Sequence, residues 1–356
     1  MIDRPARIGL DRPLRTAIIG ASASGGWALE SHVPAIQSLD GYELTAVATR
    51  SRRSAEAAMD AFGADRGYDD PAELFADADI DLVTIGVRVP AHRELVLAAV
   101  AAGKHVLTEW PLGRDVAEAQ ELRDAAADAG VHAVIGLQAR MSAAVQRTRQ
   151  LIQDGALGRI LCARLYDSTV AFGPASPQSD ADLEDPANGA THIAIHGGHA
   201  LDLATVLTGP ITPACVLQST QYPEVAVEGG DTLIRSIPDH LLVFGRTHEG
   251  APLSVEVVGG RPPDDTPFHL EITGTEARIV LVGGAIRGFQ SGRLRLRVNG
   301  EEQTIEEFPD LPEAAANVAG LYRALREDIT TGTTTAPSFD HAVRLTQLIA
   351  GIGAPA

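Results

Sequence analysis

The stretch LRTAIIGASASGGWALE, residues 14–30, decides the fold of this chain. Its apolar run TAII is short, as expected of a strand buried on both faces of a sheet. Gly20, Gly25 and Gly26 then let the backbone turn tightly beneath phosphate oxygens. A helix that begins near Gly26 or Trp27 offers unpaired N–H groups and a partial positive charge to the anion. The stretch therefore predicts a strand, a phosphate-binding turn and a helix.

The turn departs from the G-x-G-x-x-G fingerprint of dinucleotide-binding folds, because Ser22 stands where the second glycine belongs. A glycine-rich strand end also occurs in turns that bind nothing. The residues that we expect to contact a dinucleotide at this turn are Gly20, Ser22, Ser24, Gly25, Gly26 and Trp27.

An alternation of strand and helix patterns follows the turn. The strand-like segments are 41–50, 79–89, 104–110 and 132–138, and the helix-like segments between them are 54–64, 92–103 and 116–130. Such alternation predicts parallel strands joined by crossover helices, which is a doubly wound Rossmann sheet. In these sheets ligands bind outside the carboxyl ends of the strands. Candidate sites therefore lie at residues 20–26, 49–53, 88–92, 109–111 and 138–140.

The periodicity changes after Arg140. A helical segment at 141–158 leads into runs that alternate as antiparallel strands do, at 159–168, 213–221, 240–249, 252–260, 268–275, 277–284 and 293–300. We predict an α/β chain of two domains. Residues 1–140 form a dinucleotide-binding Rossmann domain, and residues 141–356 form an α+β substrate and oligomerisation domain with a broad, mainly antiparallel open sheet. Packing of the last helices against the first domain is left open. The Pro- and Gly-rich segment 171–190 is typical of a loop able to cover a site.

Composition agrees with a cytoplasmic globular protein. The 356 residues are 45% hydrophobic and 21% charged, which is enough for two cores. No run approaches the roughly 20 apolar residues of a membrane span, and no basic, apolar leader opens the chain. The net charge of -18 repels polyanions and argues against a nucleic-acid partner. Cys162 and Cys215 lack metal-ligand spacing, so we expect neither a disulfide framework nor structural zinc, and we place both in the core.

Several segments carry a resemblance to a known family. The turn near Gly20, AGKHVLTEWPLG (102–113) and GGHALDLATVL (197–207) together resemble the glucose-fructose oxidoreductase, inositol dehydrogenase and MocA-like family of nicotinamide-dependent enzymes. The segments most similar to the branch that contains the fungal galactose-pathway repressor are VRVPAHRELV (87–96), LQARMSA (137–143), GGHALD (197–202), IPDHLLVFG (237–245) and LEITGTEARIVLVG (270–283). The resemblance implies a nicotinamide dinucleotide and pairing of subunits through the open sheet. In that branch, the repressor binds a dinucleotide but works by protein contact instead of turnover.

Two catalytic positions of the family are changed in this chain. Family enzymes carry Glu-Lys-Pro after the fifth strand, where this chain has Glu109, Trp110 and Pro111. They also carry Asp-x-x-x-His in the second domain, and alignment on Asp202 puts Val206 at the histidine position. The resemblance therefore transfers Asp202 and leaves the lysine and the histidine without counterparts.

Hydride transfer also moves the hydroxyl proton, so an enzyme built this way needs another proton relay. Lys104 is the only lysine, and it stands roughly 20 Å along its strand from the vacated position. In an expected helix over 191–207, three histidines fall on one stripe, and Asp202 could orient His199 and raise its pKa. The candidate catalytic residues are Asp202, His199 and His196.

The histidine stripe also suits an amphipathic face whose polar atoms bind backbone or water. We expect no metal there, because His199 lies roughly 10 Å along the helix axis from His192. The side chains that we expect to contact a substrate are Trp110, Arg140, His192, His196 and His199.

Other strand-end residues keep two interpretations each. Trp110 forms a stacking wall for nicotinamide or an apolar substrate, or it fills the volume of the lost lysine. By resemblance Glu109 hydrogen-bonds the nicotinamide ribose; otherwise it is a buried carboxylate paired with Arg140 or Arg88. His92 caps the following helix or faces the dinucleotide, and Arg140 binds a substrate anion or forms a surface ion pair. The further expected cofactor contacts are Val87, Val89, His92, Glu109, Trp110 and Gln138.

The tip of the second strand, TRSRR at 49–53, bears on the choice of cofactor. An acidic residue there commonly binds the ribose 2′-hydroxyl of NAD, whereas arginine accommodates the 2′-phosphate of NADP. This tip has no acid, so Arg50, Ser51 and Arg52 favour NADP, with NAD as the alternative. The same arginines also suit an ordinary solvated helix start.

Three functions follow from these observations. The first is an NADP-dependent oxidoreductase that acts on a small polyol, sugar-derived or secondary-metabolite substrate. The second is a dinucleotide-binding sensor or regulator without turnover, and the third is an enzyme that keeps the cofactor site but performs non-redox chemistry. We expect a small-molecule substrate, no nucleic-acid or membrane partner, and a homodimer or homotetramer formed through the second-domain sheet.

Overall fold

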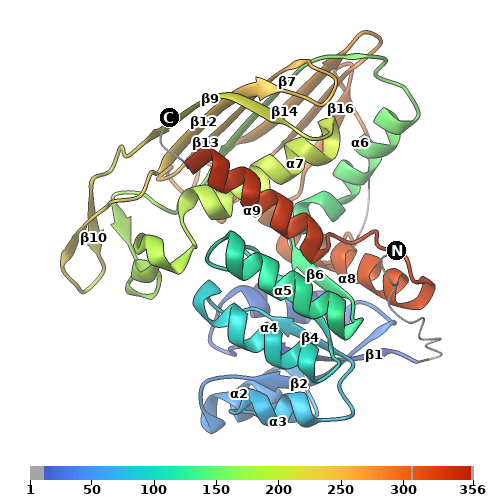
Figure 1. The fold of residues 1–356 in the computed structure, drawn as a ribbon, viewed down its shortest axis with the longest axis vertical. Helices are drawn as coiled ribbons and strands as arrows, with labels where there is room; N and C mark the ends of the chain where they lie inside the picture. The colour runs from blue at the N-terminus through green and yellow to red at the C-terminus, as the bar shows by residue number, and fades with distance from the viewer. Residues whose placement is uncertain (1–11, 306–307, 354–356) are drawn as a thin grey trace. The chain divides into compact units, whose positions relative to one another are not determined.

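The computed structural model describes residues 12–305 and 308–353 (Figure 1). The chain divides into two compact units, each described by itself below. The first contains Met1–Gly136 and Phe308–Thr346, and the second contains Leu137–Glu307 and Gln347–Ala356. The sequence predicts a domain boundary after residue 140 and does not decide whether the last helices pack against the first domain. In the structure, residues 308–346 belong to the first unit.

The first unit is built on a parallel sheet of six strands in the order β3-β2-β1-β4-β5-β6. The strands are β1 (Leu14–Ile19), β2 (Tyr42–Ala48), β3 (Arg66–Tyr68), β4 (Leu82–Ile85), β5 (His105–Glu109) and β6 (Ala133–Gly136). This is the Rossmann strand order, whose ligand crevice opens where β1 and β4 adjoin. The predicted doubly wound sheet is confirmed.

Helices join these strands, and local signals set their ends. They are η1 (Ala28–His32), α1 (Val33–Gln37), α2 (Arg52–Phe62), α3 (Pro71–Ala76), η2 (Val89–Ala91), α4 (His92–Ala101), α5 (Val116–Ala129) and α8 (Glu313–Thr331). The Ser51 hydroxyl and the Asp115 carboxylate accept backbone N–H groups at the starts of α2 and α5. Both helices end at a left-handed glycine, Gly63 and Gly130. The sequence missed the short elements β3 and α3.

The second unit is built on an eight-stranded sheet in the order β17-β16-β15-β14-β7-β13-β12-β9. Its strands are β7 (Ile160–Ser168), β9 (Thr212–Ser219), β12 (His240–Arg246), β13 (Pro252–Val258), β14 (Phe268–Gly274), β15 (Arg278–Gly283), β16 (Arg295–Val298) and β17 (Glu301–Glu302). Only the β7–β13 pair is parallel among the pairs of this described sheet. The predicted broad, mainly antiparallel sheet is confirmed.

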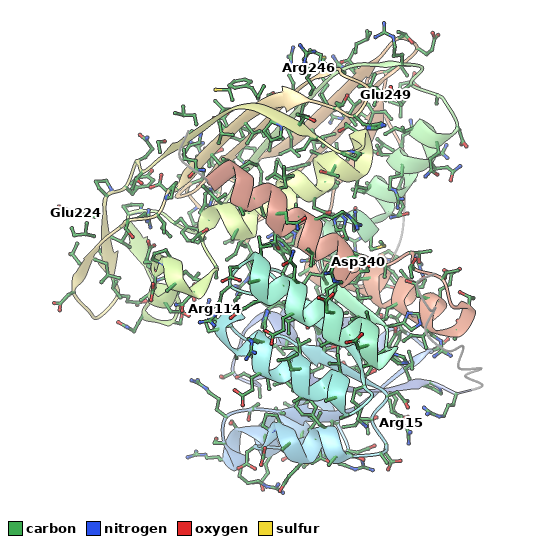
Figure 2. All side chains as sticks on the ribbon, in the orientation of Figure 1. Arg15, Arg114, Glu224, Arg246, Glu249 and Asp340 are labelled. Carbon is green, nitrogen blue, oxygen red and sulfur yellow. The ribbon has the colours of Figure 1, made fainter. Side chains whose placement is uncertain are left out.

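A small sheet of β8 (Ala175–Ser176), β10 (Glu224–Val227) and β11 (Thr232–Ile234) accompanies the large one in the second unit. Figure 2 shows Glu224 on this small sheet, and Arg246 and Glu249 at the turn between β12 and β13. The other elements of the second unit are η3 (Gln138–Met141), α6 (Ala143–Gln153), η4 (Gln178–Glu184), η5 (Pro186–Asn188), η6 (Ile193–Gly197), α7 (Gly198–Thr208) and η7 (Phe289–Ser291). Helix α9 (Phe339–Gly353) has residues in both units.

The two faces of the large sheet differ. Helix α7 packs against β7 and β13, and α6 packs against β15 and β16. The strands alternate buried and exposed residues, so their other face carries exposed apolar side chains such as Leu217 and Phe244. Cys215 is exposed on β9 and Cys162 is half-buried on β7, so the expectation that both lie in the core is wrong. Within the described residues, no helix has both the length and the apolar character needed to cross a membrane.

A buried arginine anchors the segment 171–190, which the sequence predicted as a loop. The Arg235 guanidinium donates to both carboxylate oxygens of Glu184, to the carbonyl oxygens of Phe172 and Gly173, and to Asp239. Its side chain is fully buried. The segment is therefore fixed in place, and Asp239, to which the sequence attached no chemistry, completes this ion-pair cluster.

Candidate dinucleotide and substrate sites

The turn after β1 requires glycine at its first position. Gly20 has a φ of +94°, and a Cβ there would lie 2.7 Å from the Gly86 carbonyl oxygen and 2.9 Å from Val87 Cγ1. The Gly86 amide donates to the Ile19 carbonyl at 3.0 Å, which ties the ends of β1 and β4 together. The absence of a side chain at Gly20 thus lets the two strand ends meet at the ligand crevice of the sheet.

The rest of the turn leaves bare backbone and one unsatisfied donor. Gly25 and Gly26 have φ values of +146° and +106°, and no atom lies within 4 Å of a Cβ built on either. Ser22 and Ser24 are hydrogen-bonded to each other at 2.9 Å. The indole Nε1 of Trp27 is buried without a hydrogen-bond partner among the described residues. Exposed amides and an unpaired N–H suit a diphosphate and its sugars, so these residues fit a dinucleotide.

At the tip of β2, Ser51 is committed to capping α2, while the neighbouring arginines are exposed. Ser51 Oγ accepts the Ser54 amide, and Arg52 pairs with Glu56 at 3.0 Å on the helix surface. Arg50 is exposed and lies next to this helix start. Such a surface pair is weak, so Arg52 can exchange Glu56 for a phosphate.

His92 does not cap α4. The cap position of α4 is Ala91 and has no side-chain hydrogen bond. The His92 ring is 1% exposed, and its nitrogens lie 3.0 Å from the carbonyl oxygens of Pro111 and Val87. Burial lowers the pKa of His92. The expectation that it caps the helix is wrong, and its observed contacts hold the strand-end loops that carry Val87 and Trp110.

Glu109 ends β5 and has a partner that the sequence did not suggest. Its Oε1 lies 2.9 Å from Nε2 of the buried His32, and its side chain is 17% exposed. Within the first unit, the alternative pairing of Glu109 with Arg88 is not found among the described residues. Gly136 leaves room for the carboxylate, because a Cβ there would lie 2.7 Å from Glu109 Oε1.

Trp110, which is 7% exposed, stands at the lysine position of the family. Lys104 does not replace the missing amine. Its Nζ donates to the carbonyl oxygens of Asp77 and Ile80 at 2.6 and 2.9 Å, at the amino end of the sheet.

In the second unit, the histidine segment is not a uniform α-helix. Residues Ile193–Gly197 form a π-helix, and α7 follows it, so the α-helical period used to place three imidazoles on one stripe is wrong here. The rings of His192 and His196 still lie 5.4 Å apart, and both contact the Phe172 ring edge-on. π-turns often mark functional sites because they shift side chains out of the regular register.

These two histidines are buried and neutral. Burial lowers the pKa of His192 to about 4 and holds that of His196 well below its usual value. The Nδ1 atom of each ring has no hydrogen-bond partner among the described residues. His196 cannot serve as a cationic acid in this state, but its Nδ1 can exchange a hydrogen bond with a ligand hydroxyl.

Asp202 and Arg140 form a buried ion pair. Arg140 of η3 lies 3.3 Å from the carboxylate of Asp202 on α7, with side chains 12% and 3% exposed. Arg140 thus forms an ion pair, but the pair is buried and does not lie on the surface as expected. His199 is also buried on α7, and Val206 lies one turn beyond Asp202. The pair places a carboxylate and a guanidinium side by side inside the second unit.

Asp167 is a buried carboxyl that the sequence analysis missed. It is fully buried near the end of β7, and neither oxygen has a hydrogen-bond partner among the described residues. Burial raises its pKa to about 8, and the nearby amides of Ser168 and Phe289 oppose this only in part. Alternation along β7 could have found it, since Ala163 and Leu165 face the same side.

Asp167 and His196 approach the same turn. A Cβ on Gly288 would lie 3.0 Å from His196 Nδ1, and the amide of the next residue, Phe289, lowers the pKa of Asp167 without satisfying its oxygens. Gln138, predicted as a cofactor contact, lies in the second unit on η3, which packs against η7; its Oε1 is buried without a partner among the described residues. Within the described residues, no group of three His, Cys, Asp or Glu side chains could hold a metal ion.

Two family models match consecutive parts of this chain. The model described as "Oxidoreductase family, NAD-binding Rossmann fold" matches residues 14–137, and the model of the Gal80p C-terminal domain matches residues 143–283. The chain is 32% identical over 256 residues to the dehydrogenase aclE of Aspergillus oryzae, a match that spans 69% of each protein. The chain belongs to the Gfo/Idh/MocA oxidoreductase family.

Within this family the chain also resembles a regulator. It is 28% identical over 293 residues to the galactose/lactose metabolism regulatory protein GAL80 of Saccharomyces cerevisiae, covering 77% of this chain and 67% of that protein. A solved levoglucosan dehydrogenase, in complex with NADH and levoglucosan, has the same fold with a TM-score of 0.80 and 23% identity, covering 96% of each chain. The predicted family and its Gal80-like branch are thereby confirmed.

Proposed function

We propose that this protein is an NAD(P)-dependent oxidoreductase that acts on a small polyhydroxylated substrate. The observation that carries the proposal is a set of buried polar atoms of the second unit that lack a partner among the described residues: Gln138 Oε1, both oxygens of Asp167, and Nδ1 of His192 and His196. Each such atom costs about 1–3 kcal/mol unless something hydrogen-bonds it. Their number and largely uncharged character suit a polyol or sugar-derived molecule with several hydroxyls.

For the cofactor, the bare backbone at Gly25 and Gly26 and the unpaired Trp27 indole support a dinucleotide. Exposed Arg50 and the weakly held Arg52 support NADP over NAD, because the strand tip offers no acid to a 2′-hydroxyl. When bound, the nicotinamide ring gives or takes the hydride.

For the proton, we propose Asp202 with His199 or His196, in place of the family's lysine and histidine. Arg140 pairs with Asp202 and fixes its position, so the carboxylate can orient a histidine that takes the hydroxyl proton during oxidation. Burial holds the pKa of His196 well below its usual value, so His196 is a weak base. Asp167, protonated at neutral pH, adds a hydrogen-bond donor to the substrate.

A regulator without turnover is the second candidate, and specific residues favour it. Trp110 and Val206 occupy the two positions where the family carries its lysine and histidine, and the second unit matches the Gal80p C-terminal domain. Such a protein would bind a dinucleotide and a protein partner without oxidising anything.

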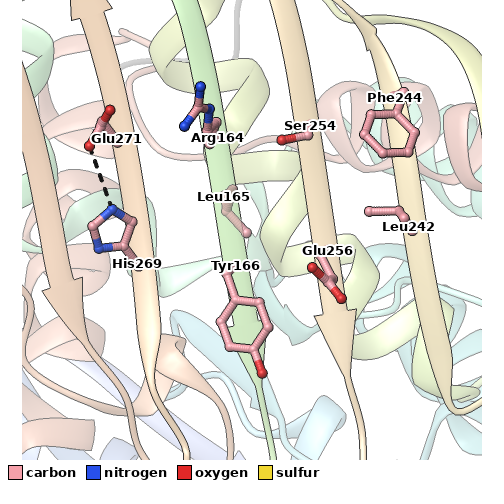
Figure 3. Close-up of a pocket in the computed structure, with 9 residues that line it drawn as sticks. All are labelled: Arg164, Leu165, Tyr166, Leu242, Phe244, Ser254, Glu256, His269 and Glu271. Carbon is pink, nitrogen blue, oxygen red and sulfur yellow. Dashed lines mark ion pairs between the residues drawn. The ribbon is translucent and has the colours of Figure 1, made fainter.

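For its own assembly, we propose a homodimer or homotetramer through the open face of the large sheet. Figure 3 shows side chains of β14, β7, β13 and β12 lining a shallow hollow on this face. The hollow combines the exposed apolar side chain of Phe244 with the charged side chains of Arg164 and Glu256. Such a mixture suits burial against a second copy. Light scattering tests this: a monomer, or a Phe244→Glu variant with the wild-type mass, would contradict it. We keep the cytoplasm as the proposed compartment.

Turnover is tested by following the absorbance of the reduced cofactor at 340 nm, with a panel of polyols and keto sugars. Turnover with any of them supports the oxidoreductase, and binding of the dinucleotide without turnover across the panel supports the regulator. For the relay, Asp202→Asn and His199→Gln should each lower kcat by at least about 100-fold. Wild-type turnover in both variants would reject the relay and leave the oxidoreductase proposal intact.

A further inference from the structure

A chain of buried hydrogen bonds in the first unit leads to Glu109. The Tyr322 hydroxyl on α8 lies 2.7 Å from Thr84 Oγ1 and 2.9 Å from His32 Nδ1, and His32 Nε2 lies 2.9 Å from Glu109 Oε1. Thr84, Tyr322 and His32 are all 0% exposed. Only the last member, Glu109, reaches the carboxyl end of the sheet with part of its side chain open.

The direction of every bond in this chain follows from its last member. A carboxylate only accepts, so His32 must donate to Glu109 from Nε2. When this imidazole carries one proton, its Nδ1 accepts, and the Tyr322 O–H is the donor to it. The Tyr322 oxygen is thereby left to accept from Thr84. Burial raises the pKa of Tyr322, so its proton stays in place.

The neighbours of His32 join this chain to the phosphate turn. The Trp27 ring packs edge-on against His32, with ring centres 6.4 Å apart, and its Nε1 is the unsatisfied donor of that turn. The neighbouring Tyr42 hydroxyl donates to the Tyr322 backbone carbonyl at 2.5 Å and not to its side chain. Tyr322, 290 positions from His32 in the sequence, thus contacts the one ring that touches both Glu109 and Trp27.

The free side of Glu109 indicates the ligand group. Among the described residues its one hydrogen bond comes from His32, which leaves Oε2 available. Glu109 ends β5, in the half of a doubly wound sheet that holds the second nucleoside of a dinucleotide, away from the β1–β2 half. An oriented, acceptor-only carboxylate there suits the paired hydroxyls of a ribose.

We propose that Tyr322 is a positioning residue: by fixing His32 as the Nε2–H tautomer, it holds Glu109 as an acceptor for the hydroxyls of the ribose next to the nicotinamide. The inference rests on the proposed dinucleotide binding. It assigns a part in cofactor affinity to α8, which begins at Glu313, far beyond the end of the last Rossmann strand at Gly136.

The test uses Tyr322→Phe, with Tyr42→Phe as the matched control. Each variant removes one buried tyrosine hydroxyl from adjacent rings, whose centres are 5.2 Å apart, but only Tyr322 belongs to the hydrogen-bond chain. Calorimetry should show that Tyr322→Phe raises the Kd for NADPH about tenfold, whereas Tyr42→Phe raises it less than about twofold. ADP, which lacks the second ribose, should bind the wild type and Tyr322→Phe equally.

A second readout needs no ligand. The ¹⁵N shifts of the His32 ring, assigned by comparison with His32→Gln, should show the Nε2–H tautomer in the wild type and in Tyr42→Phe, and loss of this tautomer in Tyr322→Phe. A wild-type ring protonated at Nδ1, or at both nitrogens, overturns the inference. Equal NADPH affinity in the wild type and Tyr322→Phe overturns it as well, while the proposed function stands. Absence of any dinucleotide binding overturns both.

Discussion

Replacing Asp167 with asparagine should change how stability depends on pH. The Asp167 carboxyl is fully buried, and burial raises its pKa to about 8. In the unfolded chain an aspartate has a pKa of about 3.9. Between these values the folded protein keeps a proton that the unfolded chain releases. The free energy of unfolding therefore falls as pH rises from about 4 to 8, by up to about 5 kcal/mol.

Asparagine has nearly the same shape and no charge, so Asp167→Asn removes this dependence. The variant should gain stability over the wild type by about 1.4 kcal/mol for each pH unit across the window, with a gain of several kcal/mol at pH 8 relative to pH 5. Urea unfolding followed by circular dichroism at pH 5, 6, 7 and 8 measures the difference. Asp264→Asn removes an exposed carboxylate and serves as the control.

A constant difference between Asp167→Asn and the wild type from pH 5 to pH 8 would refute this reasoning. It would mean that Asp167 ionises normally in the folded state, and it would remove the protonated carboxyl from the proposed substrate site. The control variant should give no more than a few tenths of a kcal/mol at any pH.

Three further outcomes are expected. Arg235→Met leaves the Glu184 carboxylate buried without its cation, so the free energy of unfolding in urea should fall by about 3–5 kcal/mol. Limited proteolysis should then cut within 171–190, and a variant as stable as the wild type would contradict this. Burial lowers the pKa of both His105 and His192 to about 4. Each histidine contributes fully to stability above about pH 6.5, and this contribution is lost as pH falls, by about 2 kcal/mol each at pH 5. In a variant with asparagine at either position, the midpoint urea concentration should therefore fall less steeply as pH is lowered from about 6.5 to about 5. Finally, Arg50→Ala should raise the Kd for NADPH about tenfold and leave that for NADH unchanged; equal effects on both would argue against NADP.

The sequence predicted the fold well because the fold depends on periodicity. Alternating strands and helices, and a change to antiparallel patterns after Arg140, give both sheets and most of their elements. The short elements β3 and α3 were missed, since three strand residues carry too little pattern. The π-turn at Ile193–Gly197 was also missed, because an α-helical period was applied to a segment that tertiary packing unwinds.

The candidate sites were predictable only where one residue acts alone. The glycine turn follows from backbone requirements at Gly20, which the sequence displays directly. Partners distant in sequence were not predictable: Glu109 is bound by His32, and His32 by Tyr322. His92 was misassigned for the same reason, because its two carbonyl partners belong to separate loops.

We propose that the first unit binds a dinucleotide through the bare backbone of the glycine turn, although the family's lysine is absent. Calorimetry of the full chain with NADPH and NADH tests it most directly, with Gly20→Ala as the variant, since a Cβ there would lie 2.7 Å from a backbone carbonyl oxygen. We expect saturable binding of one dinucleotide per chain, and we expect Gly20→Ala to abolish this binding. No binding of either dinucleotide to the wild type, or undiminished binding to Gly20→Ala, would contradict it.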